Sequence, residues 1–130
     1  NSKIDGGEVV IENGKLSGVL IDNAENLVMN YWPKSSRQDV VNALLDAQKV
    51  CFDYGLTTVD DAGLSPESIQ IIDSLQQVGD LKIRIYAMVS ASKENLEYYL
   101  NKGITKTDRL NVRSFKYYAD GALGSRGAML

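Results

Sequence analysis

From Ser35 onward the sequence alternates helix patterns with strand patterns, and this alternation constrains the fold more than any other feature. Helices are predicted over about 36–54, 66–78 and 93–102, and strands over about 56–59, 82–89 and 110–119. Strands that are separated by helices pair in parallel through right-handed crossovers. The sequence therefore predicts an α/β fold with about three parallel strand–helix units.

Residues that favour helix ends support these ranges. Ser35-Ser36-Arg37-Gln38 fits a capping box, and Ser65 followed by Pro66 is typical of a helix start. Glycines stand where the three helices should end, at Gly55, Gly79 and Gly103. The apolar face of the first helix is predicted to contain Val40, Leu44, Ala47, Cys51 and Tyr54. Cys51 is therefore expected to be a small buried side chain.

Residues 1–34 do not follow the alternation and are predicted to form a separate arm. Two strand-like segments flank Asn13-Gly14, the residue pair that a type I′ hairpin turn favours. A short helix is expected over about 23–32, ending before Pro33. The predicted domains are thus the arm at 1–34 and the α/β segment at 35–130.

Composition excludes several kinds of function. The 130 residues contain no histidine and one cysteine, so a Ser-His-Asp triad, a histidine-rich metal site and an internal disulfide are excluded. The 14 basic and 17 acidic side chains are well mixed and give a net charge of −3, which argues against nucleic acid as a partner. No apolar run is long enough to predict a membrane span. The lack of disulfides permits a cytoplasmic location without establishing one.

Polar residues gather where the predicted strands end, which is where parallel α/β folds place their ligands. Asp60 and Asp61 follow the first strand, Ser90 follows the second, and Lys116 to Asp120 end the third. Regular alternation along the third strand would put Val112, Ser114, Lys116, Tyr118 and Asp120 on one face. Plain alternatives exist for each candidate: a solvent-exposed lysine, an acidic loop at 60–61, a turn at Asp120-Gly121 and a surface charge at Arg126.

Two acids on one strand and a lysine on a later one would also suit a phospho-receiver domain. In that class, the intermediate strand should end in a phospho-accepting aspartate, and the lysine is normally followed by proline. Here the intermediate strand ends Val89-Ser90-Ala91, and Tyr117 follows Lys116. The receiver interpretation is therefore disfavoured.

Three segments together resemble a known family. Residues 16–24 resemble a "PTGVL…A" signature, residues 54–63 resemble "GITSVHDAG", and residues 115–128 resemble "VKLFADGALGSRTA". They stand in the order found in metal-dependent amidohydrolases, in the branch that includes N-substituted formamide deformylase. This resemblance implies a (β/α)₈ TIM barrel with a small β-domain. Such a barrel needs about 250 residues, so this chain would be a partial barrel plus the N-terminal β-hairpin.

The resemblance also assigns roles to residues. In relatives, the lysine that matches Lys116 is carboxylated on its side-chain nitrogen and bridges two metal ions, for which zinc is the expected element. Water activated by the metal then attacks the carbonyl of an amide-type substrate, and the C–N bond is hydrolysed. Asp60, Asp120, Gly121 and Arg126 become candidates for the substrate side of the site. Asp60 departs from the family pattern, because relatives carry a histidine at that position.

These observations lead to one main hypothesis and one alternative. The main hypothesis is an inactive fragment of a metal-dependent hydrolase, which contains no complete catalytic set, binds no metal by itself and self-associates through an exposed sheet edge. The expected partner of the parent protein is a small amide-type molecule. The alternative is a non-catalytic α/β binding or interaction module.

Overall fold

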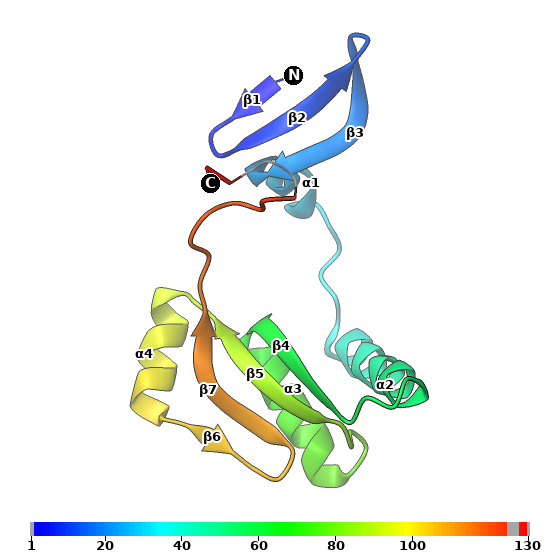
Figure 1. The fold of residues 1–130 in the computed structure, drawn as a ribbon, viewed down its shortest axis with the longest axis vertical. Coiled ribbons are helices and arrows are strands. Elements are labelled where there is room, and N and C mark those ends of the chain that lie inside the picture. The colour runs from blue at the N-terminus through cyan, green and yellow to red at the C-terminus, as the bar shows by residue number, and fades with distance from the viewer. Residues whose placement is uncertain (1, 125–127, 130) are drawn as a thin grey trace. The chain divides into compact units, whose positions relative to one another are not determined.

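The computed structural model describes residues 2–124, 128 and 129, and it divides the chain into two compact units. One unit contains residues 35–117, and the other contains residues 1–34 together with residues 118–130. Figure 1 shows the helices and strands of both units. The described residues form two sheets and four α-helices, so the predicted mixed α/β class is confirmed.

The unit at 35–117 follows the predicted alternation of helices and strands. Its elements are α2 (Arg37–Asp53), β4 (Thr58–Leu64), α3 (Pro66–Val78), β5 (Arg84–Ser90), α4 (Lys93–Lys102), β6 (Thr105–Lys106) and β7 (Leu110–Lys116). The sheet has the strand order β4-β5-β7-β6. β5 lies in the centre and pairs in parallel with β4 on one side and with β7 on the other, as the alternation predicts. β6 is a two-residue antiparallel addition that the sequence pattern did not reveal.

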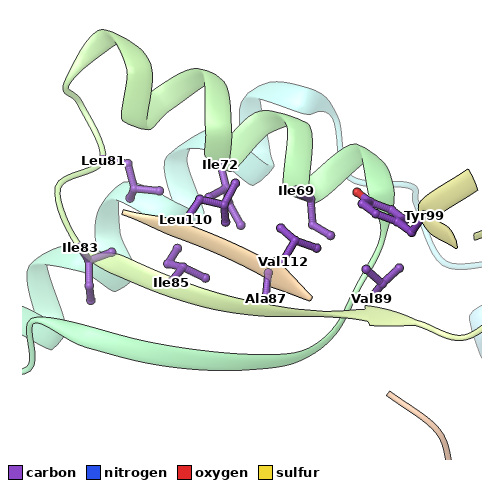
Figure 2. Packing of buried hydrophobic residues seen from close by; sticks show 10 residues of the cluster. All are labelled: Ile69, Ile72, Leu81, Ile83, Ile85, Ala87, Val89, Tyr99, Leu110 and Val112. Atoms are coloured by element: carbon purple, nitrogen blue, oxygen red, sulfur yellow. The ribbon is translucent and has the colours of Figure 1, made fainter. Parts of the chain in front are cut away.

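One face of this sheet packs against helices and forms the core (Figure 2). The inward side chains of β5 are Ile85, Ala87 and Val89, and those of β7 include Leu110 and Val112. They meet Ile69 and Ile72 of α3 and Tyr99 of α4. This burial of apolar surface is the main favourable term for the unit, and it fixes which sheet face points away from the helices.

Local interactions explain where the helices begin and end. Ser36 is the N-cap of α2: its hydroxyl accepts from the Asp39 N–H, and the Asp39 carboxylate accepts from the Ser36 N–H at 2.8 Å. The capping box is therefore one residue later than predicted. Ser65 caps α3 as expected, Ser92 caps α4, and Gly79 ends α3 with a φ of 88° that suits glycine.

The predicted apolar face of α2 is only partly correct. Val40, Leu44 and Cys51 are half-buried, and the latter two pack against the core. Tyr54 is 81% exposed because α2 ends one residue earlier. Cys51 is thus less buried than the sequence suggested, and α2 contains no fully buried residue.

The unit formed by residues 1–34 and 118–130 contains a three-stranded antiparallel sheet. Its strands are β1 (Ser2–Ile4), β2 (Gly7–Glu12) and β3 (Lys15–Asp22), in the order β1-β2-β3. Asn13 and Gly14 have φ values of 51° and 76°, which confirms the predicted hairpin turn. The helix expected over 23–32 is shorter: a 3₁₀ turn, η1 (Asn23–Glu25), leads into α1 (Asn26–Met29). Within the described part of the chain, none of the helices has the length and apolarity that a membrane span requires.

Candidate functional site at the carboxyl ends of the strands

The three parallel strands end next to one another, at Leu64 of β4, Ser90 of β5 and Lys116 of β7. Ser90 pairs directly with Lys116, and Leu64 pairs with Val89. The Ala91 N–H donates to the Lys116 carbonyl at 3.2 Å, which extends the pairing one residue beyond β5. The last residue of β7 is therefore the predicted site lysine, at the edge where parallel sheets bind ligands.

A β-bulge decides which way Lys116 faces. Ala87 and Met88 are consecutive in β5, but their partners in β7 are Val112 and Ser114, so Arg113 is an extra residue. Up to Val112, even-numbered residues face the helices, whereas after Arg113 it is Phe115 that packs against the core. Ser114 and Lys116 consequently belong to the opposite face. The prediction that Val112 shares a face with Lys116 is wrong, because it assumed a strand without a bulge.

The neighbouring strand β4 has a second bulge beside this lysine. Ala62 pairs with Met88 and Leu64 pairs with Val89, which leaves Gly63 as the extra residue with a φ of 116°. A Cβ atom added to Gly63 would lie 3.8 Å from Cγ of Lys116. The aliphatic part of the half-buried lysine therefore extends across the end of β5 toward β4.

The two aspartates of β4 lie inside the strand, not in a loop after it. β4 continues to Leu64 because its pairing with β5 does not stop at the acidic pair. Asp60 pairs with Tyr86, and Asp61 pairs with Ala87. Register therefore places Asp60 on the face of Lys116 and Asp61 on the other. Tyr86 is four residues before Ser90, the residue that pairs with Lys116. Along the strand direction, Asp60 therefore lies about 13 Å from the Ser90–Lys116 pair.

The sheet face that carries Lys116 is rich in polar groups. The Tyr86 hydroxyl donates to the Ser114 hydroxyl at 2.9 Å, across the two strands that they occupy. Asn111, the pairing partner of Tyr86, has a buried side-chain oxygen that accepts no hydrogen bond from the described residues. Sequence reasoning placed Ser114 on the face of Lys116 but missed Tyr86 and Asn111, although their alternation with Ile85, Ala87 and Val112 was visible as a period of two.

Asp120 and Gly121 belong to the other compact unit, in a loop beyond β7. β7 ends at Lys116, so the alternation expected to carry Tyr118 and Asp120 onto one face does not continue. The Asp120 carboxylate accepts from the Gly121 N–H at 2.8 Å and from the Met129 N–H at 2.6 Å. These two bonds, the one from Met129 first, lower the pKa of Asp120. Arg126 lies outside the described residues.

The described residues do not complete a metal site. Among residues 2–124, 128 and 129, no three His, Cys, Asp or Glu side chains come together as a metal cluster would require. Lys116 fits the requirement for one ligand: it ends a strand, lies on the polar face and has a glycine beside its stem. The other ligands of a two-metal centre are not supplied by this part of the chain.

Comparisons with known proteins find relatives in sequence and in fold. The chain is 30% identical to the Bacillus subtilis (strain 168) protein named "Putative amidohydrolase YtcJ", over 97% of this chain and 25% of that protein. The solved structure of an uncharacterized metal-dependent hydrolase from Pyrococcus horikoshii matches 82% of this chain and 23% of its own, with a TM-score of 0.66 and 24% identity. The solved structure of an uncharacterized metal-dependent hydrolase from Pyrococcus furiosus matches 79% of this chain and 22% of its own, with a TM-score of 0.65 and 24% identity.

These likenesses cover most of this chain and a small part of each relative. The two solved structures show that the chain shares the fold of a segment of metal-dependent hydrolases. The chain spans about a quarter of the length of the relatives it matches. It matches no family model.

Proposed function

We propose that this chain is a segment of a metal-dependent hydrolase that acts on C–N bonds of amide-type substrates. In this proposal residues 35–130 form part of a (β/α)₈ barrel, and Lys116 is one of the metal ligands. N-substituted formamides are the first substrate class to consider, because the branch that the sequence resembles includes a deformylase for them. In this proposal the 130-residue chain is inactive by itself, because no three His, Cys, Asp or Glu side chains of its described residues gather to hold a metal.

The observation that carries this proposal is the position of Lys116. It is the last residue of β7, it pairs with the last residue of β5, and register turns it away from the helix-packed face. In a barrel, the face opposite the helices lines the interior, and catalytic groups come from the carboxyl ends of several strands. The relatives support the proposal, because their names describe an amidohydrolase and metal-dependent hydrolases.

Lys116 suits the role chemically when its amine carries a carboxyl group. The resulting carbamate is an anion with two oxygens, each of which can bind a metal ion. A divalent metal such as zinc would supply Lewis-acid chemistry. The other groups that such a metal needs are not among the described residues. Asp60, Asp120, Gly121 and Arg126 remain proposals for the substrate side, and the loop-closing bonds of Asp120 also give that residue a structural role.

The test uses the protein expressed from its complete gene. Metal content is measured together with hydrolysis of a panel of amides and N-substituted formamides, for the wild type and for Lys116→Met. Methionine keeps an unbranched stem beside Gly63 and removes the amine, so we expect bound metal and hydrolysis both to be lost. Lys106→Met, which changes an exposed lysine of β6, is the matched control and should retain both.

Two results would contradict the proposal. One is a wild-type protein that holds no metal and hydrolyses none of the panel, which would favour the non-catalytic binding module. The other is full metal content and activity in Lys116→Met, which would remove this residue from the ligand set.

A further inference from the structure

Side-chain hydrogen bonds tie together the elements that meet at Lys116. The Ser90 hydroxyl donates to the Leu64 carbonyl at 3.1 Å, and the Asn95 amide donates to the Ser90 carbonyl at 2.8 Å. Both side chains are half-buried. Ser90 ends β5, and Asn95 stands in the first turn of α4. These two bonds connect β4, β5 and α4. The N–H of Ala91, the residue after Ser90, donates to the Lys116 carbonyl.

The bond from Ser90 acts where the β4–β5 ladder is irregular. A bulge leaves an extra residue unpaired and disturbs the backbone hydrogen bonds around it. Here the extra residue is Gly63, and the Ser90 hydroxyl holds the carbonyl of the next residue, Leu64. Gly63 is also the residue beside the stem of Lys116. A shift of this bulge would therefore move the surface against which the lysine lies.

Asn95 in turn holds the backbone at Ser90. Its backbone N–H donates to the Ser92 hydroxyl, which caps α4, so the residue is anchored at the helix start. Its side chain then reaches back to the Ser90 carbonyl, and the end of β5 is held relative to α4. The chain of contacts runs from α4 through Asn95 and Ser90 to Leu64, and it ends next to Lys116.

We propose that Ser90 and Asn95 are positioning residues for Lys116. They hold the lysine side chain where it can bind a metal, and they do not touch the metal themselves. The inference rests on the proposed function of Lys116. Groups that orient metal ligands from behind typically change metal affinity by about 10–100-fold when they are removed. The expected effect of losing either side-chain hydrogen bond is therefore weaker metal binding, with the fold retained.

The variants are chosen so that folding and positioning can be separated. Asn95→Asp removes the amide donor and introduces an acid near the helix start, where a negative charge is favourable. Ser90→Ala removes the hydroxyl without adding charge, and Ser90→Thr restores it. Asn101→Asp is the matched control, because the Asn101 amide makes an equivalent bond to the Glu97 carbonyl at 2.8 Å near the other end of α4.

The experiment uses the complete protein and has two readouts besides activity. The first is zinc affinity, from competition with a chelator. The second is the carbamate signal in ¹³C NMR after addition of ¹³C-bicarbonate, with the bicarbonate concentration that gives half of the full signal. We expect Asn95→Asp and Ser90→Ala to bind zinc about 10-fold or more weakly and to need more bicarbonate. Ser90→Thr and Asn101→Asp should resemble the wild type.

The Asn101→Asp control separates positioning from simple destabilisation, because the two explanations rank Asn101→Asp and Asn95→Asp in opposite order. An acid near a helix C-terminus is unfavourable, so a purely structural role predicts a larger effect for Asn101→Asp than for Asn95→Asp. Equal zinc affinity in the wild type, Asn95→Asp and Ser90→Ala would overturn the positioning role and leave Lys116 as a ligand. A wild type with neither zinc nor a carbamate signal would overturn the proposed function, and this inference with it.

Discussion

Gln48 connects α2 to the rest of its unit, and its replacement by alanine should destabilise the chain measurably. Its side-chain oxygen accepts from the Ile83 N–H at 3.1 Å and also from the Lys82 N–H. Its amide nitrogen donates to the Asp80 carbonyl at 3.1 Å. One side chain on α2 thus makes three hydrogen bonds to the segment between α3 and β5. Gln48→Ala leaves two amides and one carbonyl of that segment without these bonds.

The size of the effect follows from the exposure of these bonds. A hydrogen bond contributes about 0.5–1.5 kcal/mol net, and the low end applies here because water can reach two of the three groups. Three bonds at about 0.5 kcal/mol give a loss of about 1.5 kcal/mol in the free energy of unfolding. With a urea m-value of about 1.5 kcal/mol/M, the midpoint should fall by about 1 M.

The assay is urea unfolding followed by far-UV circular dichroism, at one protein concentration for all variants. Gln48→Glu keeps the acceptor for Lys82 and Ile83 but loses the donor to Asp80, so its midpoint should lie between those of Gln48→Ala and the wild type. Gln38→Ala is the control on the same helix, because its amide donates only to the exposed Asn42 side chain at 2.9 Å. A midpoint for Gln48→Ala equal to that of Gln38→Ala would refute the argument.

Two further predictions concern pH and association. Hydrogen bonds from Ser36, first from its hydroxyl and then from its backbone N–H, lower the pKa of Asp39 below 3.8. The ionised capping box therefore contributes stability above that pH, and this stability is lost as pH falls through the lowered pKa. Between pH 5 and 2.5, the urea midpoint should fall less for Asp39→Asn than for the wild type. Asp46→Asn is the control. For the isolated chain we propose self-association. β4 is an edge strand with one partner among the described residues, so its other edge can pair with a second copy. An apolar groove beside α4 and β7 also includes the exposed Leu100 and Ile104. Light scattering should give a mass above that of the monomer, and Leu100→Lys should reduce it; a single monomeric species at all concentrations would contradict this prediction.

Local signals in the sequence located most of the elements. Ser65 and Ser92 cap their helices, Gly79 ends one, and Asn13-Gly14 makes the hairpin turn, because each depends on side chains within a few residues. The elements that were missed depend on pairing with a neighbouring strand instead. β1 and β6 are short, carry no apolar period of their own and exist because β2 and β7 offer partners. Acidic residues similarly suggested a loop at 60–61, whereas pairing with β5 keeps them in β4.

The orientation of the candidate site also depends on strand pairing, here between β5 and β7, which lie far apart in the sequence. In a strand without a bulge, the even spacing of Leu110, Val112 and Lys116 would place the lysine on the face that packs against the helices. The extra residue Arg113 reverses the alternation, and Lys116 leaves the core for the polar face. The sequence did contain a trace of this reversal, since the apolar positions change from even to odd between Val112 and Phe115. A change of apolar phase within a strand is therefore the signal to seek when a site residue is assigned to a face from sequence.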